Sequence, residues 1–181
     1  MADHHGHGEP GHVHGESCAV AHGAAPAPVA DKVLAVVFAS PVASYLLRYG
    51  TDVGYRTILV EPDVERRRDW ADSFEHAGQI DAAAADAMDV VLTDHHRAEL
   101  GVQLRDALAA GARWVGIMGN PRVEPPHVAA LTELGVPASE ISKVHRPIGV
   151  NIGSRTPAEI AISTIAGLIA DRNGKPGGFT F

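Results

Sequence analysis

Short apolar runs recur along the chain and are separated by segments with helical spacing. The first run, KVLAVVF at residues 32–38, is continuously apolar and rich in β-branched residues. Such a run is typical of a strand buried on both faces of a parallel sheet. Similar runs predict strands at 55–60, 89–93 and 113–118, and a short last strand at 148–152.

Helical patterns fill the intervals between these strands. A helix opens at Pro41 and ends at Gly54, and a looser helical pattern over 62–87 has Trp70 and Phe74 as expected core anchors. Further helices are predicted at 97–110, 125–134, 139–143 and 157–171. Alternating strands and helices predict a single α/β domain over residues 31–181, Rossmann-like, with a mostly parallel sheet and helices on both faces.

The last predicted helix carries the strongest start signal in the chain. Thr156 is placed as N-cap, Pro157 occupies the first helical position, and Glu159 completes a capping box. The preceding loop contains Gly149 and Gly153, which can adopt positive φ and let a ligand or another backbone approach closely. A loop followed by a capped helix with exposed amides is a common way to build a binding site.

Residues 1–30 read differently from the rest of the chain. They are rich in His, Gly, Pro and Ala and offer little to bury, which predicts a disordered His-rich tail. Imidazoles bind Zn, Ni or Cu, so the tail is a candidate metal site, and the alternative interpretation is a bland tail or a cloning remnant. The candidate ligands are His4, His5, His7, His12 and His14.

Composition narrows the classes of function. A net charge of −7 argues against nucleic acid as the main partner. Cys18 is the single cysteine, which excludes an internal disulfide and favours a reducing compartment. No apolar run approaches the length that crosses a bilayer. We therefore expect a cytoplasmic protein without a membrane partner.

Ligands of open parallel sheets bind beyond the carboxyl ends of the strands, which places the candidate site in the loops there. Serine-nucleophile motifs, a P-loop, a zinc-protease motif and paired cysteines are all missing from the sequence, so no catalytic residue is assigned. The candidate binding residues are Ala39, Ser40, Pro41, Val42, Glu61, Thr93, Asp94, His95, His96, Gly119, Asn120, Arg122, Gly149, Gly153 and Arg155.

Several of these candidates have a second, structural interpretation. Ser40 is either a phosphate donor or the N-cap of the helix at Pro41. Glu61 binds a ribose hydroxyl or simply ends a strand. The His95–His96 pair beside Asp94 holds a metal, relays a proton, or belongs to an ordinary loop. Arg122 is an anion clamp or a partner in a surface ion pair.

The segment HRPIGVNIGSRTPAEIAIS, residues 145–163, resembles the signature near the end of the xanthine dehydrogenase accessory proteins of the XdhC/CoxI type. The resemblance extends over residues 32–171, with further matches at Thr93, His96, Glu99, Gly119 and Arg122. It fails in the first loop, where the family usually has Gly-x-Gly-x-x-Ala. Here Phe38 and Ser40 replace both glycines while Ala43 is retained, so the dinucleotide signal is damaged although the fold signal survives.

Members of that family help to mature molybdenum hydroxylases such as xanthine and carbon monoxide dehydrogenases. The resemblance implies binding of molybdenum cofactor (molybdopterin), with a molybdenum hydroxylase subunit or a cysteine desulfurase as partner. Because the chain lacks a counterpart of the family's N-terminal Cys-containing motif, sulfuration of the cofactor by this chain alone is not expected.

Three hypotheses follow. The first is an accessory, non-catalytic protein that binds molybdenum cofactor or another phosphate-bearing ligand, the apo-enzyme, or both. The second is an NAD(P)-binding oxidoreductase, and the third is a metal-handling protein that uses the His-rich tail. A homodimer would form if the last helix and residues 179–181 pack on a second subunit, whereas the same residues would otherwise close the monomer's core.

Overall fold

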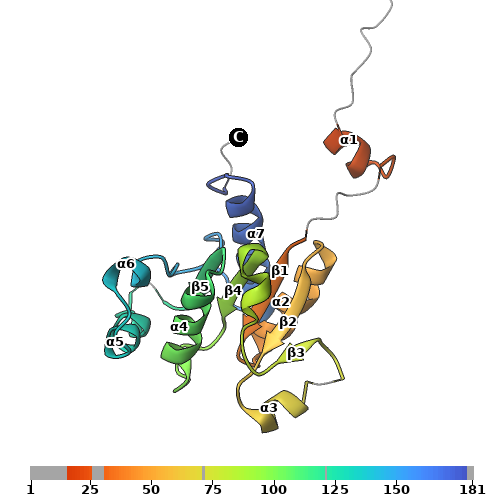
Figure 1. Cartoon of the computed structure of the whole chain (residues 1–181). Coiled ribbons are helices and arrows are strands. Elements are labelled where there is room, and N and C mark those ends of the chain that lie inside the picture. Colours follow the sequence, from red (N-terminus) through yellow and green to blue (C-terminus); the bar gives the residue numbers. More distant parts are fainter. Residues whose placement is uncertain (1–15, 26–30, 71, 121, 179–181) are drawn as a thin grey trace, which may run out of the picture.

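The computed structural model describes residues 16–25, 31–70, 72–120 and 122–178. Its centre is a parallel sheet with the strand order β3-β2-β1-β4-β5 (Figure 1). The chain runs outward from β1 to β3, returns to the other side of β1, and continues outward to β5, which places the reversal of strand order between β1 and β4. The strands are β1 (Val33–Val37), β2 (Arg56–Val60), β3 (His76–Ala77), β4 (Met88–Leu92) and β5 (Trp114–Ile117).

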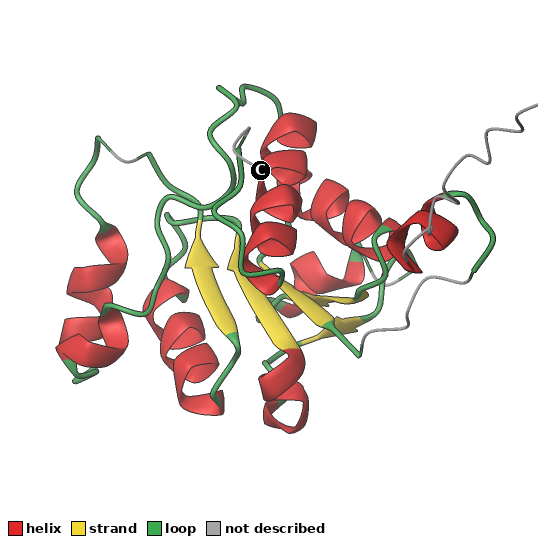
Figure 2. Ribbon diagram, turned by 90° about the horizontal axis from the view of Figure 1, so that it is seen from above, coloured by secondary structure: helices red, strands yellow, loops and turns green. Residues whose placement is uncertain are grey.

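Helices cover both faces of this sheet (Figure 2). On one face α2 (Pro41–Asp52) packs beside α7 (Pro157–Arg172), and their apolar residues form one core cluster with Leu34 and Val36 of β1. On the other face α4 (Leu100–Ala110), α5 (Pro126–Glu133) and α6 (Ala138–Ile141) cover the alternate residues of the same strands. Because β1 and β4 are buried at every position, their sequences are continuously apolar, with Asp89 as the exception.

The predicted helix over 62–87 is wrong. The segment contains α3 (Val64–Arg68), β3 and the 3₁₀ helix η1 (Ala82–Ala87). Two aspartates begin separate short helices here. The side chain of Asp63 caps the start of α3, and that of Asp81 caps the start of η1. Between these caps, the amides of Leu59 in β2 and of Glu61 directly after it donate to the carbonyls of Glu75 and Ala77, and these hydrogen bonds add β3 to the sheet. Trp70 and Phe74 still pack, partly buried, against the core.

The predicted strand over 148–152 is also wrong. Pro147 has no amide to donate, and Gly149 adopts φ +83°, so the chain leaves the extended conformation there. The Val150 amide donates to the Ser163 carbonyl of α7 instead of to the sheet. The sheet contact occurs earlier, as a parallel bridge between Gly116 and His145.

The tail predicted as disordered falls mainly outside the described residues. Its described part contains a short helix, α1 (Glu16–Ala21), in keeping with the alanines there. None of the described helices is long and apolar enough to span a bilayer.

Candidate functional site

A cavity of about 1080 Å³ opens at the carboxyl ends of β4 and β5. Three loops enclose it: the one after β4, the one after β5, and the loop over 147–155 that leads into α7. Parallel strands end at the same edge of a sheet, which is why these loops meet. Ten of the predicted binding residues line the cavity: Thr93, Asp94, His95, His96, Gly119, Asn120, Arg122, Gly149, Gly153 and Arg155.

Positive groups outnumber acids on the cavity wall. Arg122 and Arg155 are the cationic lining residues and Asp94 is the acidic one, although the whole chain has a net charge of −7. His95 and His96 lie beside them, with ring centroids 4.0 Å apart. Burial lowers the pKa of His95, and the charges of His96 and Arg146 lower that pKa further against the opposing effect of Asp94. The cavity is therefore suited to an anionic group.

Gly149 allows the loop over 147–155 to lie directly on α7. A Cβ added to Gly149 would come within 2.9 Å of the Ser163 carbonyl carbon and the Thr164 amide nitrogen. The sequence suggested that either a ligand or another backbone approaches this glycine. In the structure, the backbone of α7 does so. Gly153 also has positive φ, but a Cβ there would meet nothing within 4 Å.

The capping box predicted at the start of α7 is confirmed. Thr156 Oγ1 accepts from the Glu159 amide, and Glu159 Oε2 accepts from the amides of Thr156 and Arg155. These bonds lower the pKa of the Glu159 carboxyl. Since the box already uses three amides, the helix terminus offers fewer donors to a ligand than its sequence suggested.

Arg146 shapes the loop after β5. Its guanidinium donates to the carbonyls of Asn120 and Val123, at 2.8 and 3.1 Å. A Cβ on Gly119 would collide with the Arg146 guanidinium, so any other residue at this position would displace the Arg146 side chain. Gly119 thus has a structural role in addition to its place on the cavity wall. His145 stacks on Trp114 with ring centroids 4.8 Å apart.

The loop after β1 is bonded to Thr93, the residue directly after β4, and does not line the cavity. Ser40 Oγ donates to Thr93 Oγ1 at 2.9 Å, and Thr93 Oγ1 in turn bonds the carbonyls of Val37 and Phe38. Ser40 Oγ also accepts from the Ala43 amide, which confirms its interpretation as N-cap of α2. The predicted binding residues Ala39, Ser40, Pro41 and Val42 are not among those that line the cavity.

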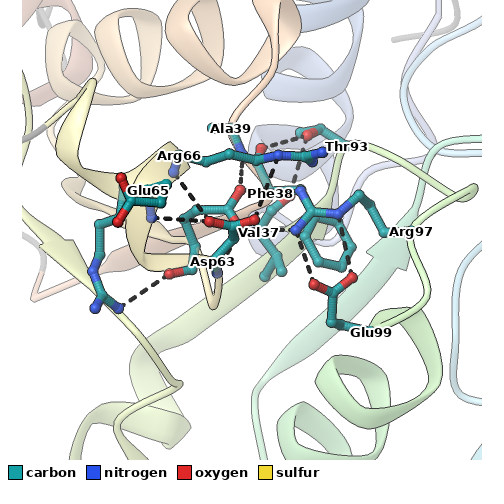
Figure 3. Close-up of polar contacts among 11 residues, drawn as sticks. Val37, Phe38, Ala39, Asp63, Glu65, Arg66, Thr93, Arg97 and Glu99 are labelled. Atoms are coloured by element: carbon teal, nitrogen blue, oxygen red, sulfur yellow. Dashed lines mark hydrogen bonds and ion pairs between the residues drawn. The ribbon is translucent and has the colours of Figure 1, made fainter.

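Glu61, the fifth predicted residue outside the cavity, is buried in an ion pair. Its two carboxylate oxygens accept from Arg97 at 2.9 and 3.2 Å and from the amides of Ala39 and Asp63 at 2.9 and 3.0 Å. Arg97 also pairs with Glu99 and lies over the ring of Phe38, with Cζ 4.7 Å from the ring centroid (Figure 3). A basic residue three positions after Asp94, at the same edge of the sheet, was the available signal for this partner.

Apolar residues also line the cavity. Ile148 and Ile152 belong to the segment 148–155, which the sequence already places beyond the strand ends. Met118, Ile160 and Ser163 were missed, because the sequence assigns Met118 to a strand and the other two to the last helix.

The predicted metal ligands His4, His5, His7, His12 and His14 lie outside the described residues. Within the part of the chain that the structure describes, no group of three or more His, Cys, Asp or Glu side chains is arranged to hold a metal ion. The ligand-binding roles assigned from the sequence stay predictions.

The strand order, the reversal between β1 and β4 and a cavity at the carboxyl edge define a Rossmann-type α/β domain. Residues 34–168 match the family described as the XdhC Rossmann domain. Because the match covers most of the chain, the chain belongs to this family, and the resemblance seen in the sequence is confirmed.

Two further proteins are similar to parts of the chain. The uncharacterized protein YqeB of Escherichia coli (strain K12) is 40% identical over 65 residues, which is 36% of this chain and 12% of YqeB. A crystal structure described as a xanthine dehydrogenase from Bacillus halodurans superposes with a TM-score of 0.54 at 20% identity, covering 80% of this chain and 45% of that one. The matched parts are less than half of either protein, and the second likeness supports the fold alone.

Proposed function

We propose that this domain is an accessory protein in the maturation of a molybdenum hydroxylase of the xanthine or carbon monoxide dehydrogenase type. It holds a phosphate-bearing ligand, with molybdenum cofactor as the first candidate, in the cavity beyond β4 and β5. Membership of the XdhC Rossmann domain family supports the maturation role. The observation that carries the ligand class is the cationic cavity wall in an acidic chain.

The cavity suits a ligand that combines a phosphate with a flat organic ring system. Arg122 and Arg155 line the cavity and would pair with the phosphate, for which guanidinium groups are well shaped. Met118, Ile148 and Ile160 offer apolar surface for the ring system. A volume of about 1080 Å³ is slightly above the usual range for small-molecule sites, which is about 300–1,000 Å³.

Molybdenum cofactor, when bound, supplies the metal centre that the client hydroxylase uses. The domain's own part is to bind the phosphate, orient the ring system and present the ligand to the apo-enzyme at the open cavity. Residues 34–168 contain no cysteine, so no sulfur transfer is assigned to this domain.

The proposal is tested on untagged protein purified gently from its native host. Mass spectrometry of the released ligand is expected to find a pterin, and pull-down is expected to retain a molybdenum hydroxylase subunit. The Arg122→Gln/Arg155→Gln variant should lose the pterin while keeping its fold. Finding neither a pterin nor a hydroxylase subunit on the wild type would overturn the proposal.

A further inference from the structure

Glu61 occupies the position at which a dinucleotide-binding domain of this fold holds a ribose, about twenty residues beyond the first loop. In this protein the carboxylate is fully buried, and each of its oxygens accepts from Arg97 and from one backbone amide. A ribose hydroxyl would have to displace one of these donors. Glu61 would then lose a bidentate, charge-assisted bond from Arg97 and gain a neutral hydrogen bond from the hydroxyl.

We propose that Arg97 takes the place of a ribose on Glu61 and is the specificity-determining residue that excludes dinucleotides from this domain. The inference concerns the carboxyl ends of β1 and β2. It therefore goes beyond the proposed function and does not rest on it, since the cationic cavity lies over β4, β5 and α7.

Arg97 is held from three sides. Its guanidinium pairs with Glu61. It also pairs with Glu99 and lies over the Phe38 ring (Figure 3). The Arg97 side chain is 9% exposed. Swinging it away would leave the buried carboxylate of Glu61 without its cationic partner, which is strongly unfavourable. The guanidinium is consequently a fixed part of the site.

Phe38, in the loop after β1, supports the Arg97 guanidinium. It stands where the first glycine of the dinucleotide fingerprint is usual and adopts φ +72°, a conformation that favours glycine. Its ring is completely buried among the core residues and supports the guanidinium from below. Phe38 therefore both removes the first glycine of the fingerprint and positions Arg97, the side chain that occupies the place of the ribose.

The backbone amides that would bind a pyrophosphate are either already used in hydrogen bonds within the protein or missing. The Ala39 amide donates to Glu61, the Ala43 amide donates to Ser40, and Pro41 has no amide hydrogen. A pyrophosphate at the start of α2 would thus lack three of the donors available in a glycine-rich loop. The ligand of this domain is expected to lie entirely over β4, β5 and α7 and to be smaller than a dinucleotide.

NADH titration of the full chain, followed by the fluorescence of the nicotinamide, tests this inference. The wild type is expected to show no saturable binding up to about 1 mM. The Phe38→Gly/Ser40→Gly variant restores the glycines but keeps Arg97, and it should also fail to bind. Adding Arg97→Ser should create saturable binding with a dissociation constant at least about tenfold below that 1 mM limit.

Circular dichroism and thermal melts establish that both variants fold. Saturable NADH binding by the wild type would overturn the proposal, and so would a folded double variant that binds as well as the triple variant. If the triple variant does not fold, hydrogen exchange of the wild type decides the question. Protection of residues 38–43 by NADH contradicts the exclusion, and unchanged exchange there at about 1 mM NADH supports it.

Discussion

Arg172, in the last turn of α7, donates from Nε to Asp89 Oδ2 of β4 at 2.8 Å, although 83 residues separate the two along the chain. The same carboxylate accepts from Tyr55 at 2.8 Å and from Arg113 at 2.6 Å, and it is completely buried. This cluster lies at the amino edge of the sheet, opposite the cavity. It fixes α7, whose other end carries the capping box and the loop of the candidate site.

Replacing Asp89 by Asn should therefore destabilise the whole domain. We expect a loss of about 3 kcal/mol in the free energy of unfolding, at the lower end for a broken buried ion pair, because Arg113 and Arg172 are partly exposed. Urea denaturation followed by circular dichroism measures it. The control is Asp106→Asn, which breaks an exposed pair with Arg105 and should cost less than about 1 kcal/mol. Equal losses in the two variants would contradict the role given to Asp89.

Gly149 and Gly153 provide a matched pair of substitutions in the loop before α7. Both have positive φ, so alanine at either position should cost about 1–2 kcal/mol in backbone conformation. Only at Gly149 would the added Cβ also collide with the α7 backbone, for roughly 1–3 kcal/mol more. Thermal unfolding should rank Gly149→Ala well below Gly153→Ala, and the reverse order would refute the contact described here.

The cavity should bind anions more tightly as the pH falls. Burial, with His96 and Arg146, keeps the pKa of His95 below its usual value, so this imidazole is neutral at pH 7. A bound anion favours the protonated ring and raises this pKa. Binding then takes up a proton, and by linkage the affinity increases as the pH falls from about 7.5 to about 5.5.

Sulfate is the appropriate probe for this effect, because its charge is constant over that range. Calorimetric titration of the wild type should show tighter binding at the lower pH, and His95→Gln should flatten the dependence. His76→Gln, which removes an imidazole from β3 outside the cavity, is the control. An unchanged slope in His95→Gln would show that another group is responsible.

The main strands and helices could be predicted because each carries its signal locally. Apolar runs marked β1 and β4, and Thr156, Pro157 and Glu159 marked the start of α7. The helix predicted over 62–87 was wrong because β3 forms through hydrogen bonds to β2. This tertiary contact leaves no pattern in the local sequence. Much of the cavity could be anticipated because parallel strands bring their carboxyl ends to one edge.

The environment of Glu61 could not be predicted in the same way. Its position after β2 fitted a ribose-binding residue, and the sequence alone does not show that Arg97, 36 residues later, fills that position. Gly149 was correctly expected to permit a close approach, but whether a ligand or a backbone approaches depends on the packing of the loop on α7. In both cases the sequence indicated the chemical property of the residue. The group that contacts it, Arg97 for Glu61 and the α7 backbone for Gly149, depends on the tertiary structure.

The most direct test of the phosphate-binding cavity is the affinity of the purified protein for the oxidised, fluorescent form of molybdopterin, measured with and without its phosphate group. We expect the wild type to bind the phosphorylated form. We expect Arg122→Gln/Arg155→Gln to bind that form at least about tenfold more weakly. The control Arg48→Gln/Arg105→Gln removes the same charge outside the cavity and should bind as the wild type does. Equal affinity for the two forms of the pterin, or equal loss in the two double variants, would contradict a phosphate site formed by Arg122 and Arg155.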